Sequence, residues 1–137
     1  MGRAGARPDR GHRHGELSGI SVTDTRPGQP GWTLTGQATD FVNGATTAPA
    51  ADFGWIPALL APGSDAEGAP LAGPAVPPRM QSPQSGGLAV PGATLASAPP
   101  GSGLGTQHVG AAMALWLPDT APTGTYTSLL TITLIGP

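Results

Sequence analysis

The chain has 137 residues, which suits a single domain with a core of moderate size. Only 10% of the residues are charged, the formal net charge is -2, and there is no cysteine. The missing cysteines exclude disulfides, thiolate metal sites and cysteine nucleophiles, and no apolar run approaches the ~20 residues of a membrane helix. The 22 glycines and 17 prolines predict a large share of loops.

Residues 1–16 form a basic arm that we expect to be disordered. The arm holds four of the six arginines, set among glycines, and shows no hydrophobic periodicity. Residues 17–137 are acidic and the arginines are not interleaved with aromatic residues, so we do not expect a nucleic-acid partner. His12 and His14 have a spacing that a metal could use, but this arm offers nothing to orient them, and no metal or other cofactor is expected.

Strand signals follow the arm. Residues 17–25 are rich in β-branched side chains, and a Pro/Gly turn follows at 26–31. Residues 32–41 alternate, with threonines and Gln37 on one face and an apolar set on the other. Residues 52–60 are a further candidate strand, in which Pro57 indicates an edge or a bulge. The apolar face of the second strand consists of Trp32, Leu34, Gly36 and Ala38.

A long middle region carries weaker signals. Residues 57–100 hold ten of the seventeen prolines, and we expect most of this stretch to be irregular, with a strand-like patch at 92–98. A loop of this length is unusual in a compact domain. It therefore indicates either a variable insertion or a binding surface.

The C-terminal third has the clearest alternation. Residues 108–117 and 125–135 each place apolar side chains on one face, and residues 118–124 read as a turn between them. Two alternating runs around a Pro/Gly turn predict an antiparallel β-hairpin. We expect its core face to bury Leu115, Leu117, Leu130, Ile132 and Leu134.

Together these segments predict an all-β fold. Short strands separated by turn signals are typical of an antiparallel β-sandwich or a barrel. We favour a sandwich with a long Gly/Pro-rich loop region, formed by residues 17–137 as one domain. No Ser-His-Asp set, calcium loop or phosphate-binding loop stands out, so we expect a protein that is not an enzyme.

Two segments resemble the WxL domain of Gram-positive surface proteins, in its actinobacterial form. The first is Trp32-Thr33-Leu34, which follows a β-branched stretch, and the second is the threonine-rich strand at 125–135. The family's second Trp-x-Leu is replaced here by Ile132-Thr133-Leu134. The resemblance covers residues 17–137 and implies noncovalent attachment to the cell wall through peptidoglycan or other surface proteins, on a secreted or cell-surface protein.

The tryptophans are the candidate binding residues. Trp32, Leu34, Trp55 and Trp116 could form a patch that contacts sugar faces, because an indole combines a broad apolar face with a polar N–H. The alternative is that these side chains fill the core between two sheets, as alternating apolar residues do.

Two further questions stay open at this point. A virion or assembly protein that uses the arm and the long loop for subunit contacts is the second hypothesis for function. The first residues also lack the apolar stretch of a signal peptide. Taken as written, the sequence would not direct its own export, whereas a truncated start or a fragment would have lost that signal.

Overall fold

The structure is a computed structural model that describes residues 12–28, 30–118 and 120–136. Within these ranges the chain is all-β, as predicted, with nine strands and two short 3-10 helices. The elements in chain order are β1 His12–Asp24, β2 Trp32–Ala38, β3 Phe41–Asn43, β4 Thr46–Ala48, η1 Ala50–Asp52, β5 Phe53–Leu59, β6 Leu71–Ala72, η2 Gly87–Ala89, β7 Ala93–Ala98, β8 Gly105–Trp116 and β9 Leu130–Ile135.

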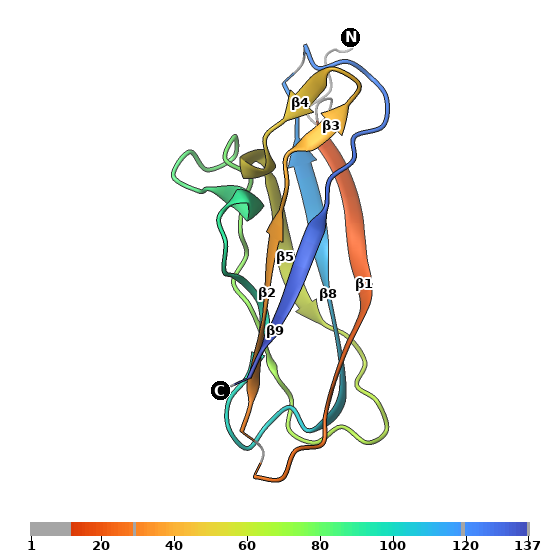
Figure 1. Ribbon diagram of the computed structural model, residues 1–137, viewed down its shortest axis with the longest axis vertical. Helices are drawn as coiled ribbons and strands as arrows, with labels where there is room; N and C mark the ends of the chain where they lie inside the picture. The colour runs from red at the N-terminus through yellow and green to blue at the C-terminus, as the bar shows by residue number, and fades with distance from the viewer. Residues whose placement is uncertain (1–11, 29, 119, 137) are drawn as a thin grey trace.

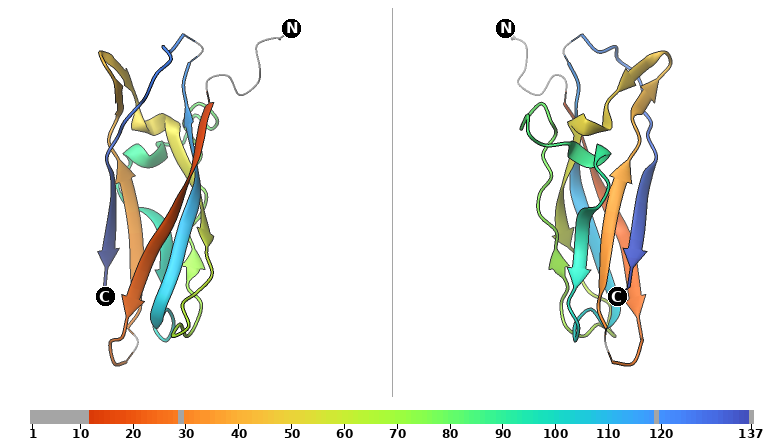
Figure 2. Two further views of the ribbon diagram at one scale, coloured as in Figure 1. Left: turned by 90° about the vertical axis from the view of Figure 1, so that its right-hand side faces the viewer. Right: turned by 60° about the vertical axis from the view of Figure 1, so that its left-hand side comes forward.

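The main strands form two facing layers. Sheet A has the strand order β1-β8-β5 and sheet B has the order β6-β7-β2-β9, while β3 and β4 make a separate hairpin. Every pairing between these strands is antiparallel. The two layers and the hairpin at one end are visible in Figures 1 and 2. The predicted antiparallel β-sandwich is therefore the observed architecture.

The core lies between the two sheets. β2 shows the alternation that its sequence predicts, with every second residue buried from Trp32 to Ala38. Its buried face meets inward residues of sheet A, and Leu88 from η2 closes the core from the side. The buried apolar residues of this cluster are Val22, Trp32, Leu34, Ala38, Ala50, Trp55, Leu88, Leu95, Ala96, Ala98, Val109 and Ala111.

The predicted disordered arm ends earlier than expected. Residues 12–16 belong to β1, where His12 pairs with Trp116 and Glu16 pairs with Ala112. The prediction was wrong here because basic and glycine residues mask the alternation of a strand whose outer face is solvated. Residues 1–11 lie outside the described ranges.

The predicted C-terminal hairpin does not form. β8 lies between β1 and β5 in sheet A, whereas β9 pairs with β2 in sheet B. Between them the chain crosses from one layer to the other at the end that carries β3 and β4 (Figure 1), and Thr127 bridges Val42 on the way. Alternation fixes which face of a strand is apolar, but it does not choose the strand's partner.

Burial along the last strand also differs from the prediction. Leu115 and Leu117 are buried, and Leu130 and Ile132 pack partly against the core. Leu134 is 55% exposed. It faces the core side but lies on an edge strand, so neighbouring chain covers it from one side only.

The region between β5 and β7 runs along the side of the sandwich. Its regular elements are β6 and η2, and the strand-like patch at 92–98 is confirmed as β7. β5, which contains Pro57, is an edge strand in continuous register with β8. Beyond that edge, Val76 exchanges two backbone hydrogen bonds with Trp55. Residues 75–78 therefore lie along β5, and we call them the strap.

Candidate functional site

Three of the four predicted binding residues lie in the core. Trp32 and Leu34 are each 3% exposed and Trp55 is 1% exposed. Their side chains present almost no surface to a ligand in this structure. The alternative interpretation, in which these side chains fill the space between the sheets, describes where they lie.

Trp55 connects the two layers of the sandwich. Its ring packs against Gly36 of the opposite sheet so closely that a β-carbon at that position would collide with the Trp55 ring and press on Ile132. The buried indole nitrogen of Trp55 has no hydrogen-bond partner among the described residues. Shape complementarity with Gly36, and not a polar contact, therefore holds this side chain in place.

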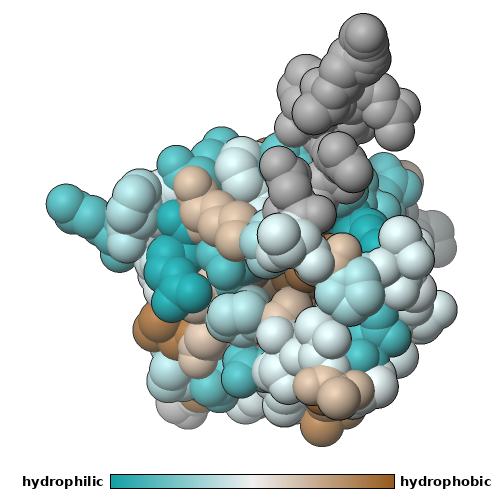
Figure 3. Space-filling model, turned by 90° about the horizontal axis from the view of Figure 1, so that it is seen from above, coloured by the Kyte–Doolittle hydropathy of each residue, from teal (hydrophilic) through white to brown (hydrophobic). Residues whose placement is uncertain are grey.

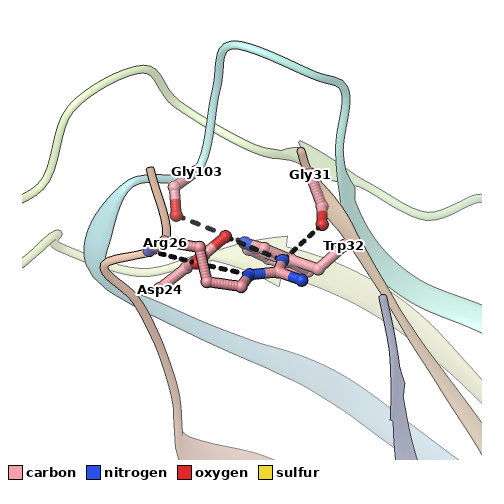
Figure 4. A network of polar contacts seen from close by, with 5 residues as sticks. All are labelled: Asp24, Arg26, Gly31, Trp32 and Gly103. Atoms are coloured by element: carbon pink, nitrogen blue, oxygen red, sulfur yellow. Dashed lines mark hydrogen bonds and ion pairs between the residues drawn. The ribbon is translucent and has the colours of Figure 1, made fainter. Parts of the chain in front are cut away.

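A polar network holds Trp32 at the turn between β1 and β2 (Figure 4). Its indole N–H donates to the carbonyl oxygen of Gly103 at 3.2 Å. Beside it, the guanidinium of Arg26 donates to both carboxylate oxygens of Asp24, at 2.9 and 3.0 Å, and to the carbonyl of Gly31 at 2.8 Å. These bonds from Arg26 lower the pKa of Asp24 to about 2. The network closes this end of the sandwich and leaves no free donor for a ligand on Trp32.

Trp116 is placed differently from the other tryptophans. Val109, Ala111 and Leu115 of β8 point into the core, and the period of two therefore turns Trp116 to the outer face of sheet A. Trp116 remains partly exposed there. It is the member of the predicted set whose side chain can meet a partner.

An imidazole supports the indole of Trp116. The ring of His12 from β1 stacks on Trp116 with a centroid distance of 3.9 Å and an interplanar angle of 15°. His14, two residues further on the same face of β1, approaches His12 edge-on at 6.1 Å. The three rings form an aromatic ledge along one side of sheet A, which we call the Trp116 ledge. The two histidines were not predicted as site residues, because they fall in the segment that was expected to be a disordered arm.

A groove of about 280 Å³ lies beside the Trp116 ledge on the outer face of sheet A. Three small residues form its floor, Gly54 of β5 and Ala112 and Ala114 of β8, and Gly54 pairs directly with Ala114. The side chain of Ile56 is 63% exposed and projects beside this floor. The lining residues are His14, Gly54, Trp55, Ile56, Ala75, Val76, Pro77, Pro78, Gln81, Ala112, Met113, Ala114 and Trp116.

The strap closes the far side of the groove. Its hydrogen bonds run between Val76 and Trp55, from N–H to carbonyl oxygen in both directions, at 2.8 and 2.9 Å. A side chain at position 54 would collide with the carbonyl of Val76 and with the backbone of Pro77 and Pro78. Gly54 therefore lets the strap lie directly against sheet A. The small floor residues carry no sequence signal of a site. The strap lies within residues 57–100, for which the sequence left open a variable insertion or a binding surface, but no residue there indicated this groove.

The groove can make apolar and stacking contacts. Its lining is dominated by apolar residues and also includes His14, Gln81 and Trp116, whose side chains carry polar groups. Among these described lining residues there is no carboxylate, serine, lysine or arginine. Concave apolar surfaces with a few polar groups at their margins are typical of binding sites.

A second hollow of about 390 Å³ lies at the end of the sandwich near β4. It contains the buried carboxylate of Asp52, which accepts the N–H of Met80 at 2.9 Å and lies 3.5 Å from Arg79. Tyr126 at its rim donates to the carbonyl of Pro122. These polar groups are already engaged within the chain. Figure 3 looks onto this end, and the visible surface mixes hydrophilic and apolar residues without one broad apolar patch.

Neither a metal cluster nor a membrane-spanning helix is found in the described residues. Over the described ranges, no group of three or more His, Asp or Glu side chains is arranged to hold a metal ion. No helix in the described part of the chain is long and apolar enough to cross a bilayer.

Comparison with known proteins gave no match: no family model, no curated protein and no solved structure is significantly similar to this chain.

Proposed function

We propose that the chain is a non-catalytic module that attaches to a cell-surface polymer through the groove beside the Trp116 ledge. The observation that carries this proposal is the stacking of Trp116 on His12 at 3.9 Å, at the margin of an apolar groove. A stacked pair of rings is held rigid before a ligand arrives. Binding of a ligand to this pair of rings therefore costs little side-chain entropy.

The chemistry of the groove suits a glycan. The apolar face of a sugar ring packs on an indole, while its hydroxyl groups need polar partners, which the lining residues His14, Gln81 and Trp116 can supply. The groove is not an enclosed cavity, so a segment of a long polymer can lie in it while the rest of the polymer stays in solvent. The described lining has no pair of carboxylates and no nucleophile, which supports binding over catalysis.

Peptidoglycan of a Gram-positive wall is the polymer that we propose. The resemblance of Trp32-Thr33-Leu34 and of the last strand to WxL domains supports it. On this proposal Trp32 and Leu34 stabilise the fold, since both are buried, and Trp116 contacts the polymer. The proposed location is accordingly secreted or at the cell surface.

Co-sedimentation with purified Gram-positive cell walls tests the proposal. Wild-type protein should appear in the wall pellet, and Trp116→Ala should remain in the supernatant. Leu71→Ala is the matched control, because Leu71 is a large apolar residue that is 60% exposed on β6 of the other sheet. It should sediment as the wild type does.

Two outcomes would refute the proposal. Wild-type protein that stays entirely in the supernatant at low salt would exclude wall binding. Equal sedimentation of wild type and a folded Trp116→Ala variant would exclude this groove as the site.

A further inference from the structure

We propose that two copies of this chain associate through the free edge of β9, in an antiparallel pairing centred on Ile132. This inference is independent of the groove, which lies on sheet A. β9 is the last strand of sheet B and pairs on one side with β2. Its other edge carries backbone N–H and carbonyl groups that pair with no other described strand. Such an edge is a template for another strand.

The other sheet edges are protected, and the edge of β9 is not. β1 has a register shift between Leu17 and Ile20 and carries charged side chains, while β6 is only two residues long. The edge of β5 is bridged by the strap at Val76, and the strand contains Pro57. Bulges, charges, prolines and short strands are the usual defences of an edge. β9 contains no charge, proline or glycine, and its register with β2 is continuous over six pairs.

The sequence of β9 is complementary to itself. Residues 130–134 read Leu-Thr-Ile-Thr-Leu, which is the same in both directions. When two such strands run antiparallel about a two-fold axis at Ile132, Leu130 faces Leu134 of the other copy and Thr131 faces its Thr133. Apolar pairs then lie on one face of the joined sheet and threonine pairs on the other. A two-fold axis requires this kind of self-complementary surface.

The core side of β9 is left uncovered in one copy. Leu134 lies opposite Leu34 yet is more than half exposed, beside an opening lined by Val22 and Trp32. Leu130 of a second copy would be placed against Leu134 and would cover it. The pairing thus removes apolar surface from water in addition to satisfying the backbone of the edge.

Charge does not oppose the association. β9 is neutral along its length, and the nearby Arg26 is already paired with Asp24. The two-fold axis places the two Arg26 side chains at opposite ends of a ladder roughly 20 Å long, beyond the screening length of about 8–10 Å. A ladder of six residues is smaller than a standard interface, so the dimer should be weak, with a Kd of about micromolar or higher.

Sedimentation velocity across low to high micromolar concentration tests this inference. The wild-type chain should shift from monomer to dimer as its concentration rises. The variant Thr131→Lys/Thr133→Lys should remain monomeric, because both side chains are exposed and the pairing would oppose lysine to lysine. Thr47→Lys/Thr123→Lys adds the same charge at exposed threonines away from β9 and should dimerise as the wild type does.

Charge reversal keeps the test independent of folding. The variant Thr131→Glu/Thr133→Glu should also be monomeric alone, and mixing it with the lysine variant should restore a dimer. A wild-type chain that is monomeric at every concentration would overturn the proposal. So would a dimer that persists in the lysine variant, or a mixture of the two charged variants that fails to associate.

Discussion

Leu34 and Leu134 lie opposite each other in the pairing of β2 with β9, yet Leu34 is 3% exposed and Leu134 is 55% exposed. Both side chains point to the core side of sheet B. The difference arises because β2 has a neighbouring strand on each side, whereas β9 is an edge strand. Position within the sheet, and not the local sequence pattern, decides which of two alternating leucines is buried.

The first prediction compares these two leucines. Leu34→Ala should lower the free energy of unfolding by about 2–5 kcal/mol, since it removes a buried side chain. Leu134→Ala should lower it by less than about 1 kcal/mol, because more than half of that side chain is already in water. Denaturant melts at low protein concentration, where β9 of one copy is free, provide the measurement. Equal shifts of the two midpoints would contradict the assigned strand order.

The second prediction concerns the contact of Trp55 with Gly36. Gly36→Ala should destabilise the fold by about 1–3 kcal/mol, because the added methyl group has no space beside the ring. Combining it with Trp55→Phe should cost less than the sum of the two single changes, as a double-mutant cycle would show. Gly15→Ala is the control, since a β-carbon there meets no atom within 4 Å. Strict additivity would show that the two residues do not touch.

The third prediction is a pH dependence that depends on Asp24. Arg26 lowers the pKa of Asp24 to about 2 in the folded chain, against about 3.9 for an unperturbed aspartate. Asp24 therefore binds its proton more readily in the unfolded state. The stability that it contributes is complete above about pH 4 and is lost as the pH falls towards 2.

Thermal melts of wild type and Asp24→Asn test this dependence. The wild type should be the more stable protein near neutral pH, and its advantage should shrink between about pH 4 and pH 2. Other carboxylates titrate in the same range, so the difference between the two proteins is the quantity to follow. A difference that stays constant across this range would mean that the ion pair with Arg26 does not form in solution.

The strands and their buried faces could be predicted from the sequence, but the strands with which they pair could not. The buried face of β2 from Trp32 to Ala38 follows directly from alternation. The separation of β8 from β9 does not, because the choice of partner depends on contacts between distant segments. The start of β1 at His12 was hidden by the composition of its solvated face.

The candidate site was predictable only in part. Trp116 was proposed from its residue type, but three other candidates proposed on the same grounds lie in the core. Gly54 gave no signal, and the strap at Val76 lies in a proline-rich region that was predicted only as either a variable insertion or a binding surface, because glycine, alanine and proline are common throughout this chain. Only the pairing of β5 with β8 and the strap shows that they form a groove.

The most direct test of the proposed function is a fluorescence titration with soluble peptidoglycan fragments. The side chains of Trp32 and Trp55 are buried between the sheets, so a ligand in the groove should change chiefly the emission of Trp116. We expect a saturable change in the wild type that is lost in Trp116→Phe. No change in wild-type emission, or an equal change in Trp116→Phe, would contradict the assignment of this groove as the binding site.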